Sequence, residues 1–149
     1  MICISKDITP KKPRDMLTIK DFTTNHENLV NLLSVATYGN EWPVVKAFKS
    51  DAEKGLFENC ECREDKWAKG LLEGKGVVVY DCYALDDAET EEEKAEARHE
   101  ITIDDIEIGL GLMRALYPRH YADLMEENDD LITGDIFLQL TVFRDVIYG

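Results

Sequence analysis

The sequence predicts an α+β fold in which several helices pack on a small antiparallel sheet, with the C-terminal helix at the centre. Apolar residues recur at helical spacing in several separate segments. Segment 76–83 begins with a glycine and is rich in β-branched and aromatic residues, and segment 98–103 can pair back with it as a hairpin partner. The length of 149 residues suits one domain. We expect an extended arm over 1–15 and a single α+β domain over 16–149, with an acidic insertion at 84–98.

The first helix is expected to begin near Thr24 and to end at Gly39. Thr24 and Glu27 have the spacing of a capping box, in which each side chain binds a free backbone amide at the helix start. Gly39 suits the position after a helix, where a left-handed backbone is common. A loop or short extended piece is predicted for 40–43, and a second, shorter helix for 64–73.

The middle of the chain is predicted to complete the sheet and to form a third helix. The acidic run between the two strands is expected to be a long solvated connection or a short exposed helix. Thr102 suits the N-cap of the third helix, and Pro118 ends its apolar pattern. Gly109 and Gly111 inside this helix each cost about 1 kcal/mol relative to alanine, which predicts close packing there. A short amphipathic segment follows at 120–127.

The last helix is expected over 135–147, with Thr133 as its cap and apolar residues nearly all the way round. Such a helix is normally the buried centre of a domain or buries one face in a partner subunit. We expect it to pack on the first helix and on the 76–83 strand, with Phe143 buried. Its surplus of apolar residues also favours a homodimer. Three further aromatic residues could join an exposed apolar patch: Trp42, Trp67 and Tyr148.

Charge is the most unusual feature of the composition. The chain has 31 acidic and 17 basic residues and a formal net charge of −14. This balance argues against direct binding to nucleic acid or to an anionic membrane, because both require a positive surface. No apolar run reaches the ~18 residues of a membrane span, and the N-terminal residues lack a secretory signal pattern. We therefore expect a cytoplasmic protein with reduced cysteines.

No arrangement of residues in the sequence predicts a metal, a cofactor or a catalytic reaction. A zinc site would need Cys60, Cys62, Cys82 and a histidine, but their spacing gives no paired C-x-x-C motif. Segment 128–135 approaches a calcium loop and then places apolar residues where ligands should lie, so a solvated turn is favoured. The histidines have no nucleophile or acid at motif spacing, and His26 and His99 are expected at ordinary surface positions. We therefore predict that the chain is not an enzyme.

Four segments together resemble a family of small, uncharacterised proteins encoded by bacteriophages and prophages. They are Ala36–Trp42, Gly76–Asp81, Ile101–Gly109 and the Asp-Ile-x-x-Gln-x-x-x-Phe-x-x-Val-Ile-Tyr-Gly tail, Asp135–Gly149. The tail is the specific part. Arg144 stands where such proteins often have glycine, and the run 84–97 is longer and more acidic here. The family has no established activity, so the resemblance implies phage origin and little else. For a phage protein, the cytoplasm expected above is that of the host cell.

Segment 81–107 concentrates the negative charge, with twelve acidic groups against Lys94 and Arg98. One interpretation is a solvated surface that keeps the protein soluble. The other is a displayed row of carboxylates that imitates nucleic-acid phosphates. If 88–97 is helical, a stripe of four carboxylates forms: Glu89, Glu92, Glu93 and Glu96. The candidate partner-binding residues are Asp86, Asp87, Glu89, Glu91, Glu92, Glu93 and Glu96.

Phage origin and an acidic surface together indicate a class of partner. Phages need small proteins that block host nucleic-acid machinery, and such targets present basic grooves. We expect an inhibitor that binds the basic nucleic-acid-binding site of a host defence protein, of the anti-CRISPR or anti-restriction kind. The alternatives are a phage structural or assembly component, and an accessory factor in phage DNA metabolism.

Overall fold

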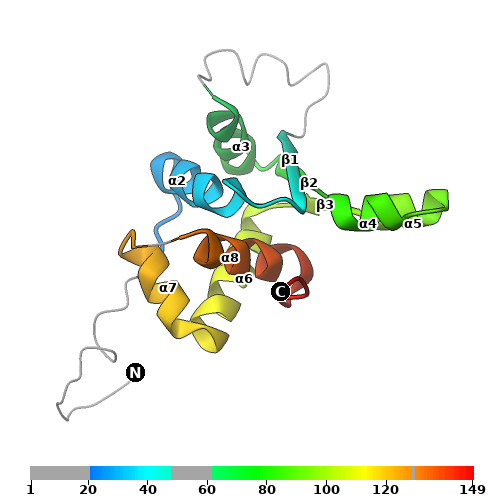
Figure 1. Ribbon diagram of the computed structural model, residues 1–149. Coiled ribbons are helices and arrows are strands. Elements are labelled where there is room, and N and C mark those ends of the chain that lie inside the picture. Colours follow the sequence, from blue (N-terminus) through cyan, green and yellow to red (C-terminus); the bar gives the residue numbers. More distant parts are fainter. Residues whose placement is uncertain (1–20, 48–61, 129) are drawn as a thin grey trace, which may run out of the picture.

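The computed structural model describes residues 21–47, 62–128 and 130–149 and confirms the α+β fold (Figure 1). The described helices are α2 (His26–Thr37), α3 (Arg63–Leu72), α4 (Cys82–Asp87), α5 (Glu91–Glu96), α6 (Ile103–Leu116), α7 (Pro118–Met125) and α8 (Leu131–Phe143). The described strands are β1 (Pro43–Ala47), β2 (Val77–Asp81) and β3 (Arg98–Ile101). The predicted arm over 1–15 and residue Cys60 lie outside the described residues.

The sheet is antiparallel with the strand order β1-β2-β3, so β2 is its central strand. The predicted pairing of segments 76–83 and 98–103 is confirmed: β2 pairs with β3, and Val79 lies opposite His99. After the first helix the sequence predicts only a loop or short extended piece over 40–43, whereas the chain forms the five-residue strand β1 from Pro43 onward. Strand β1 pairs with the other edge of β2, with Val45 opposite Val79. Pro43 is compatible with this strand because it is the first residue and lies at the sheet edge.

The predicted 76–83 strand is too long at its C-terminal end. Strand β2 ends at Asp81, and Cys82 already begins helix α4. The carboxylate of Asp81 accepts a hydrogen bond from the Ala84 amide at 3.2 Å and so caps α4. This N-cap outweighs the β preference of the aromatic residue that follows.

Two predicted helix caps are wrong and one is confirmed. Asn25, not Thr24, caps α2, and its side chain accepts the backbone amide three residues further on at 2.9 Å. Asp130, not Thr133, caps α8 in the same way, at 2.9 Å. Asn and Asp are as strong as Ser and stronger than Thr at this position. Thr102 does cap α6 in a capping box, as expected.

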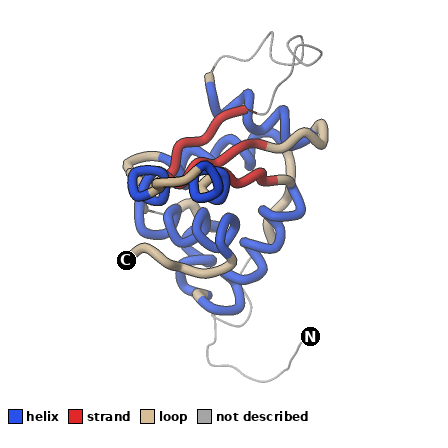
Figure 2. Tube along the Cα trace, turned by 90° about the vertical axis from the view of Figure 1, so that its right-hand side faces the viewer, coloured by secondary structure: helices blue, strands red, loops and turns tan. Residues whose placement is uncertain are grey.

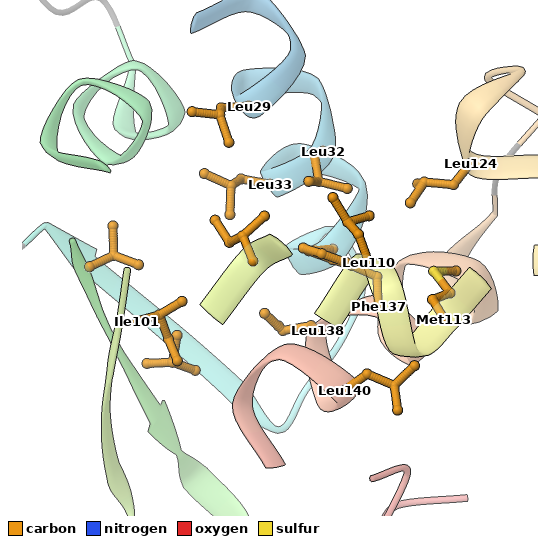
Figure 3. Close-up of a cluster of buried hydrophobic side chains, with 14 of the residues drawn as sticks. Leu29, Leu32, Leu33, Ile101, Leu110, Met113, Leu124, Phe137, Leu138 and Leu140 are labelled. Carbon is orange, nitrogen blue, oxygen red and sulfur yellow. The ribbon is translucent and has the colours of Figure 1, made fainter. Parts of the chain in front are cut away.

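Helix α8 forms the centre of the core, as predicted (Figure 3). It packs most extensively on α6 and α2, and it reaches the sheet through β3 more than through the expected 76–83 strand. Phe137 and Leu140 of α8 are fully buried, and so are Leu29 of α2 and Met113 of α6. The helix ends at Phe143 rather than at 147, because the next residue has a left-handed backbone.

Most apolar residues of α8 pack inside the chain, whereas Leu131 and Ile132 at its start are exposed. Phe143 is only half-buried, contrary to the prediction, and its ring lies 5.1 Å from that of Trp42. Trp42 and Trp67 are 3% and 2% exposed and Tyr148 is half-buried, so the expected exposed patch of these three residues is wrong. The homodimer expected from the sequence therefore loses the argument from this patch and stays a prediction. In the described part of the chain, no helix is long and apolar enough to cross a membrane.

Candidate functional site

The acidic segment forms a projecting structure between β2 and β3, which we call the acidic protrusion (residues 82–97). Helices α4 and α5 lie in line and extend away from the body of the molecule (Figure 1). In the perpendicular view the two helices point toward the reader in front of the sheet (Figure 2). Neither helix contributes a buried residue to the core. The protrusion is therefore held by the strands at its base and by local hydrogen bonds.

Local capping explains why α5 forms despite its charge. The Oγ1 of Thr90 accepts the Glu93 amide at 3.1 Å, and the Oε1 of Glu93 accepts the amides of Thr90 and Glu89, both at 3.0 Å. These two backbone amides hold the pKa of the Glu93 carboxyl below its usual range. The sequence Thr-Glu-Glu-Glu is thus a capping box, and Glu93 has a structural role.

The structure places all seven predicted partner-binding residues on this protrusion, and all are exposed. Two lie at the end of α4, one lies in the link, and four lie on α5: Asp86, Asp87, Glu89, Glu91, Glu92, Glu93 and Glu96.

The predicted stripe of four carboxylates does not form as expected. Helix α5 begins at Glu91, so Glu89 precedes it, and Glu93 turns back to its own N-terminus. Glu92 and Glu96 alone keep the expected i, i+4 relation within the helix. The carboxylates form a cluster around a short projection rather than a row along one helix face.

This cluster contributes little to the stability of the fold. The ion pair between Lys94 Nζ and Glu91 Oε1, at 3.3 Å, is solvent-exposed, and such pairs contribute about 0–1 kcal/mol. The three glutamates in the first turn of α5 are stabilised by the positive end of the helix dipole. Glu96 lies in the last turn, where a negative charge is unfavourable. Residues 82–97 carry seven acidic groups and one basic group.

A cavity of about 430 Å³ lies at the base of the protrusion, and we call it the base pocket. Its walls come from β2, the protrusion, β3 and the C-terminal tail (residues 144–149) with the end of α8. Its lining residues are Asp81, Ala84, Asp87, Ala88, Glu93, Glu96, His99, Phe143, Ile147 and Tyr148. Three of its acidic residues could be predicted from the sequence, but the pocket could not, because its walls come from segments far apart in the chain.

The C-terminal tail is held against this pocket by Gln139, which is fully buried. Gln139 Oε1 accepts the backbone amides of Ile147 and Tyr148 at 2.7 and 2.8 Å, and its Nε2 donates to Asp135 Oδ2 at 3.0 Å. The hydroxyl of Tyr148 then donates to Asp81 Oδ2 at 2.5 Å. Residues of the C-terminal motif Asp135–Gly149 thus form one hydrogen-bond network that joins the C-terminal tail to the base of the protrusion.

Aromatic rings form the apolar side of the pocket. Tyr148 packs edge-on to Tyr83 with 5.0 Å between centroids, and His99 packs edge-on to Phe143 at 5.3 Å. Burial raises the pKa of Tyr148 well above its usual range, and its hydrogen bond to Asp81 raises it further. Burial also lowers the pKa of His99, against the attraction of Asp81. His99 is therefore half-buried in a pocket wall, not at the ordinary surface position expected for it.

Several of the residues considered for metal binding have other contacts. Asp130 caps α8, and Asp135 Oδ1 accepts the indole N–H of Trp42 at 2.7 Å. His26 pairs with Asp65 of α3 at 3.1 Å. Cys62 is exposed, and Cys82 is half-buried and free. Within residues 21–47, 62–128 and 130–149, no group of three or more His, Cys, Asp or Glu residues lies close enough to hold a metal ion.

Comparison with known proteins adds no relative. No protein-family model matches the chain. No curated protein and no solved structure matches it either. The phage resemblance therefore stays a prediction that rests on the four segments named above.

Proposed function

We propose that this chain is a binding protein whose acidic protrusion docks on a basic surface of another protein. The supporting observation is that seven exposed carboxylates are concentrated on a projection that buries no side chain of its two helices. A surface needed only for solubility can be spread over the whole molecule. Concentrating like charges on one short segment instead costs stability, because they repel each other.

Electrostatic attraction makes such a protrusion effective. Opposite potentials steer two proteins together and raise their association rate, mostly at low salt. Basic nucleic-acid-binding sites are natural targets, because carboxylates can occupy the places of phosphates, which occur once per ~1.7 Å of duplex axis. With the phage resemblance, the target we propose is a host defence protein of the anti-CRISPR or anti-restriction kind. The proposed role is inhibition by occupying the basic site, without catalysis and without a cofactor.

Affinity capture from a bacterial lysate with mass spectrometry tests this proposal. The test variant changes Glu89, Glu92 and Glu96 to lysine and leaves the capping residue Glu93 intact. The matched control makes the same charge change at three exposed glutamates outside the protrusion: Glu73, Glu107 and Glu126.

We expect the wild type and the control to retain the same basic protein, and the protrusion variant to lose it. Binding should also weaken as added salt shortens the Debye length from ~10 Å at 0.1 M to ~3 Å at 1 M. Capture that is unchanged in the protrusion variant would contradict the proposal. Recovery of capsid or tail proteins would instead favour an assembly role, and recovery of replisome proteins would favour an accessory role in DNA metabolism.

A further inference from the structure

The geometry points to the base pocket as a binding site for a basic side chain. Arginine fits best, because its guanidinium group can both pair with carboxylates and stack on aromatic rings. This inference rests on the proposed function, because the arginine would belong to the partner protein. The partner would insert it beneath the acidic protrusion. The cavity of about 430 Å³ falls within the size range of small-ligand pockets.

The acidic wall of the pocket favours a cation. Asp87 of α4 and Glu93 and Glu96 of α5 line the cavity, so two helices contribute three acidic residues to it. Within the described part of the chain, neither Asp87 nor Glu96 forms an ion pair that would neutralise it. An anion would be repelled here, and a neutral apolar group would remove water from the carboxylates without replacing their hydrogen bonds.

The aromatic wall of the pocket favours a planar, stacking group. It is lined by His99, Phe143 and Tyr148 together with Ile147. A guanidinium group stacks on aromatic faces and also binds carboxylates in a bidentate manner. An ammonium group can use the carboxylates but not the planar stacking, so lysine should bind less tightly than arginine.

Buried hydrogen bonds hold these two walls in position. Asp81 is 3% exposed, and its two carboxylate oxygens accept from the Ala84 amide and from the Tyr148 hydroxyl. Asp81 thereby links the start of the protrusion to the C-terminal tail, and Gln139 holds the tail from the core side. A pocket that is formed before binding loses less entropy when a side chain enters it.

NMR titration of the full chain with Nα-acetyl-arginine methylamide tests the inference. The probes are the ring resonances of His99, Phe143 and Tyr148. We expect saturable shifts with the arginine compound, weaker binding of the lysine compound, and no saturable shift with the citrulline compound, which has nearly the same shape but no charge. Glu96→Gln should weaken arginine binding by about tenfold, as for the loss of one charge-assisted hydrogen bond. Glu92→Gln is the matched control, because Glu92 lies on the same helix but does not line the pocket.

Equal shifts with the arginine and citrulline compounds would overturn the inference. So would equal weakening by Glu96→Gln and Glu92→Gln. Both residues are exposed, so thermal unfolding should confirm that each variant folds. The capture experiment is independent of this one: if arginine saturates the pocket but no basic protein is captured, the proposed function fails and the pocket stands. If the protrusion captures a basic protein but the pocket does not prefer arginine over citrulline, the inference alone fails.

Discussion

Two glycines in α6 have different surroundings, although the sequence predicts close packing at both. A Cβ on Gly109 would lie 2.9 Å from the Thr141 Cα and 2.1 Å from its Oγ1, whereas a Cβ on Gly111 would have no heavy atom within 4 Å. Gly109→Ala should therefore lower the free energy of unfolding by about 1–3 kcal/mol through overpacking. Gly111→Ala should raise it by about 0.5–1 kcal/mol, because alanine favours the helix. Urea denaturation of both variants measures this, and a similar change in both would show that α6 and α8 are less closely packed.

Arg144 occupies a left-handed backbone position with a φ of 63°, directly after α8. Such a position favours glycine. Glycine is also the residue that proteins of the phage family resembled by this sequence often have there. Arg144 compensates with an ion pair to Asp105 at 2.7 Å and a hydrogen bond to the Thr141 carbonyl oxygen. Although burial raises the pKa of Asp105, the hydrogen bonds from Arg144 and Thr102 bring it below its usual range.

Substitution at Arg144 separates these two effects. Both Arg144→Ala and Arg144→Gly lose the ion pair, but only alanine is strained by the left-handed backbone, so Arg144→Ala should be less stable than Arg144→Gly by about 1 kcal/mol. The difference between Arg144→Gly and the wild type then reports the loss of the arginine contacts together with the relief of the backbone. Denaturation in urea at neutral pH measures the difference. An alanine variant as stable as the glycine variant would show that the left-handed backbone is not strained.

His99 should make stability depend on pH. Burial lowers its pKa in the folded chain, so below about pH 6.5 the unfolded chain binds a proton more readily. The stability contribution of neutral His99 is thus complete above that pH and is lost as the pH falls toward the lower folded pKa. In His99→Gln, the decrease in the free energy of unfolding between pH 7.5 and 5.5 should be smaller than in the wild type. An equal decrease would assign the pH dependence to other groups.

Among the elements, the tail depends on one buried side chain. Gln139→Leu preserves most of the volume but removes the acceptor of the Ile147 and Tyr148 amides. We expect these two amides to lose their protection in hydrogen exchange, while the amides of the α8 core remain protected. Tyr148→Phe is the control, because it removes only the bond to Asp81 and should leave both amides protected. Retained protection in Gln139→Leu would mean that the tail packs mainly through its aromatic rings.

Elements with a strong apolar period could be predicted from the sequence, whereas those that depend on tertiary contacts could not. Helices α2, α3 and α6 repeat apolar residues at helical spacing, and β2 with β3 has the signals of a hairpin. Strand β1 was missed because only its pairing with β2 makes it a strand.

The acidic residues of the candidate site could also be predicted, because charge is visible in the composition. The fold-back of Glu93 could have been recognised from the Thr-x-x-Glu spacing at Thr90. The base pocket could not, since the fold alone brings Asp81, His99 and Tyr148 together.

On the scale of the whole molecule, the net charge of −14 should itself weaken the folded state. Folding brings the carboxylates closer together than they are in the unfolded chain, so added NaCl should raise the free energy of unfolding by screening their repulsion. If the protrusion concentrates this repulsion, changing Glu89, Glu92 and Glu96 to lysine should raise stability at low salt and reduce its salt dependence. The same change at Glu73, Glu107 and Glu126 should have a smaller effect on both. Urea denaturation at 0.05 and 0.5 M NaCl measures all three proteins. Equal gains in the two variants would mean that the repulsion depends on net charge alone, whereas a larger gain in the protrusion variant would show that these carboxylates cost stability where they stand, as expected of residues placed for binding.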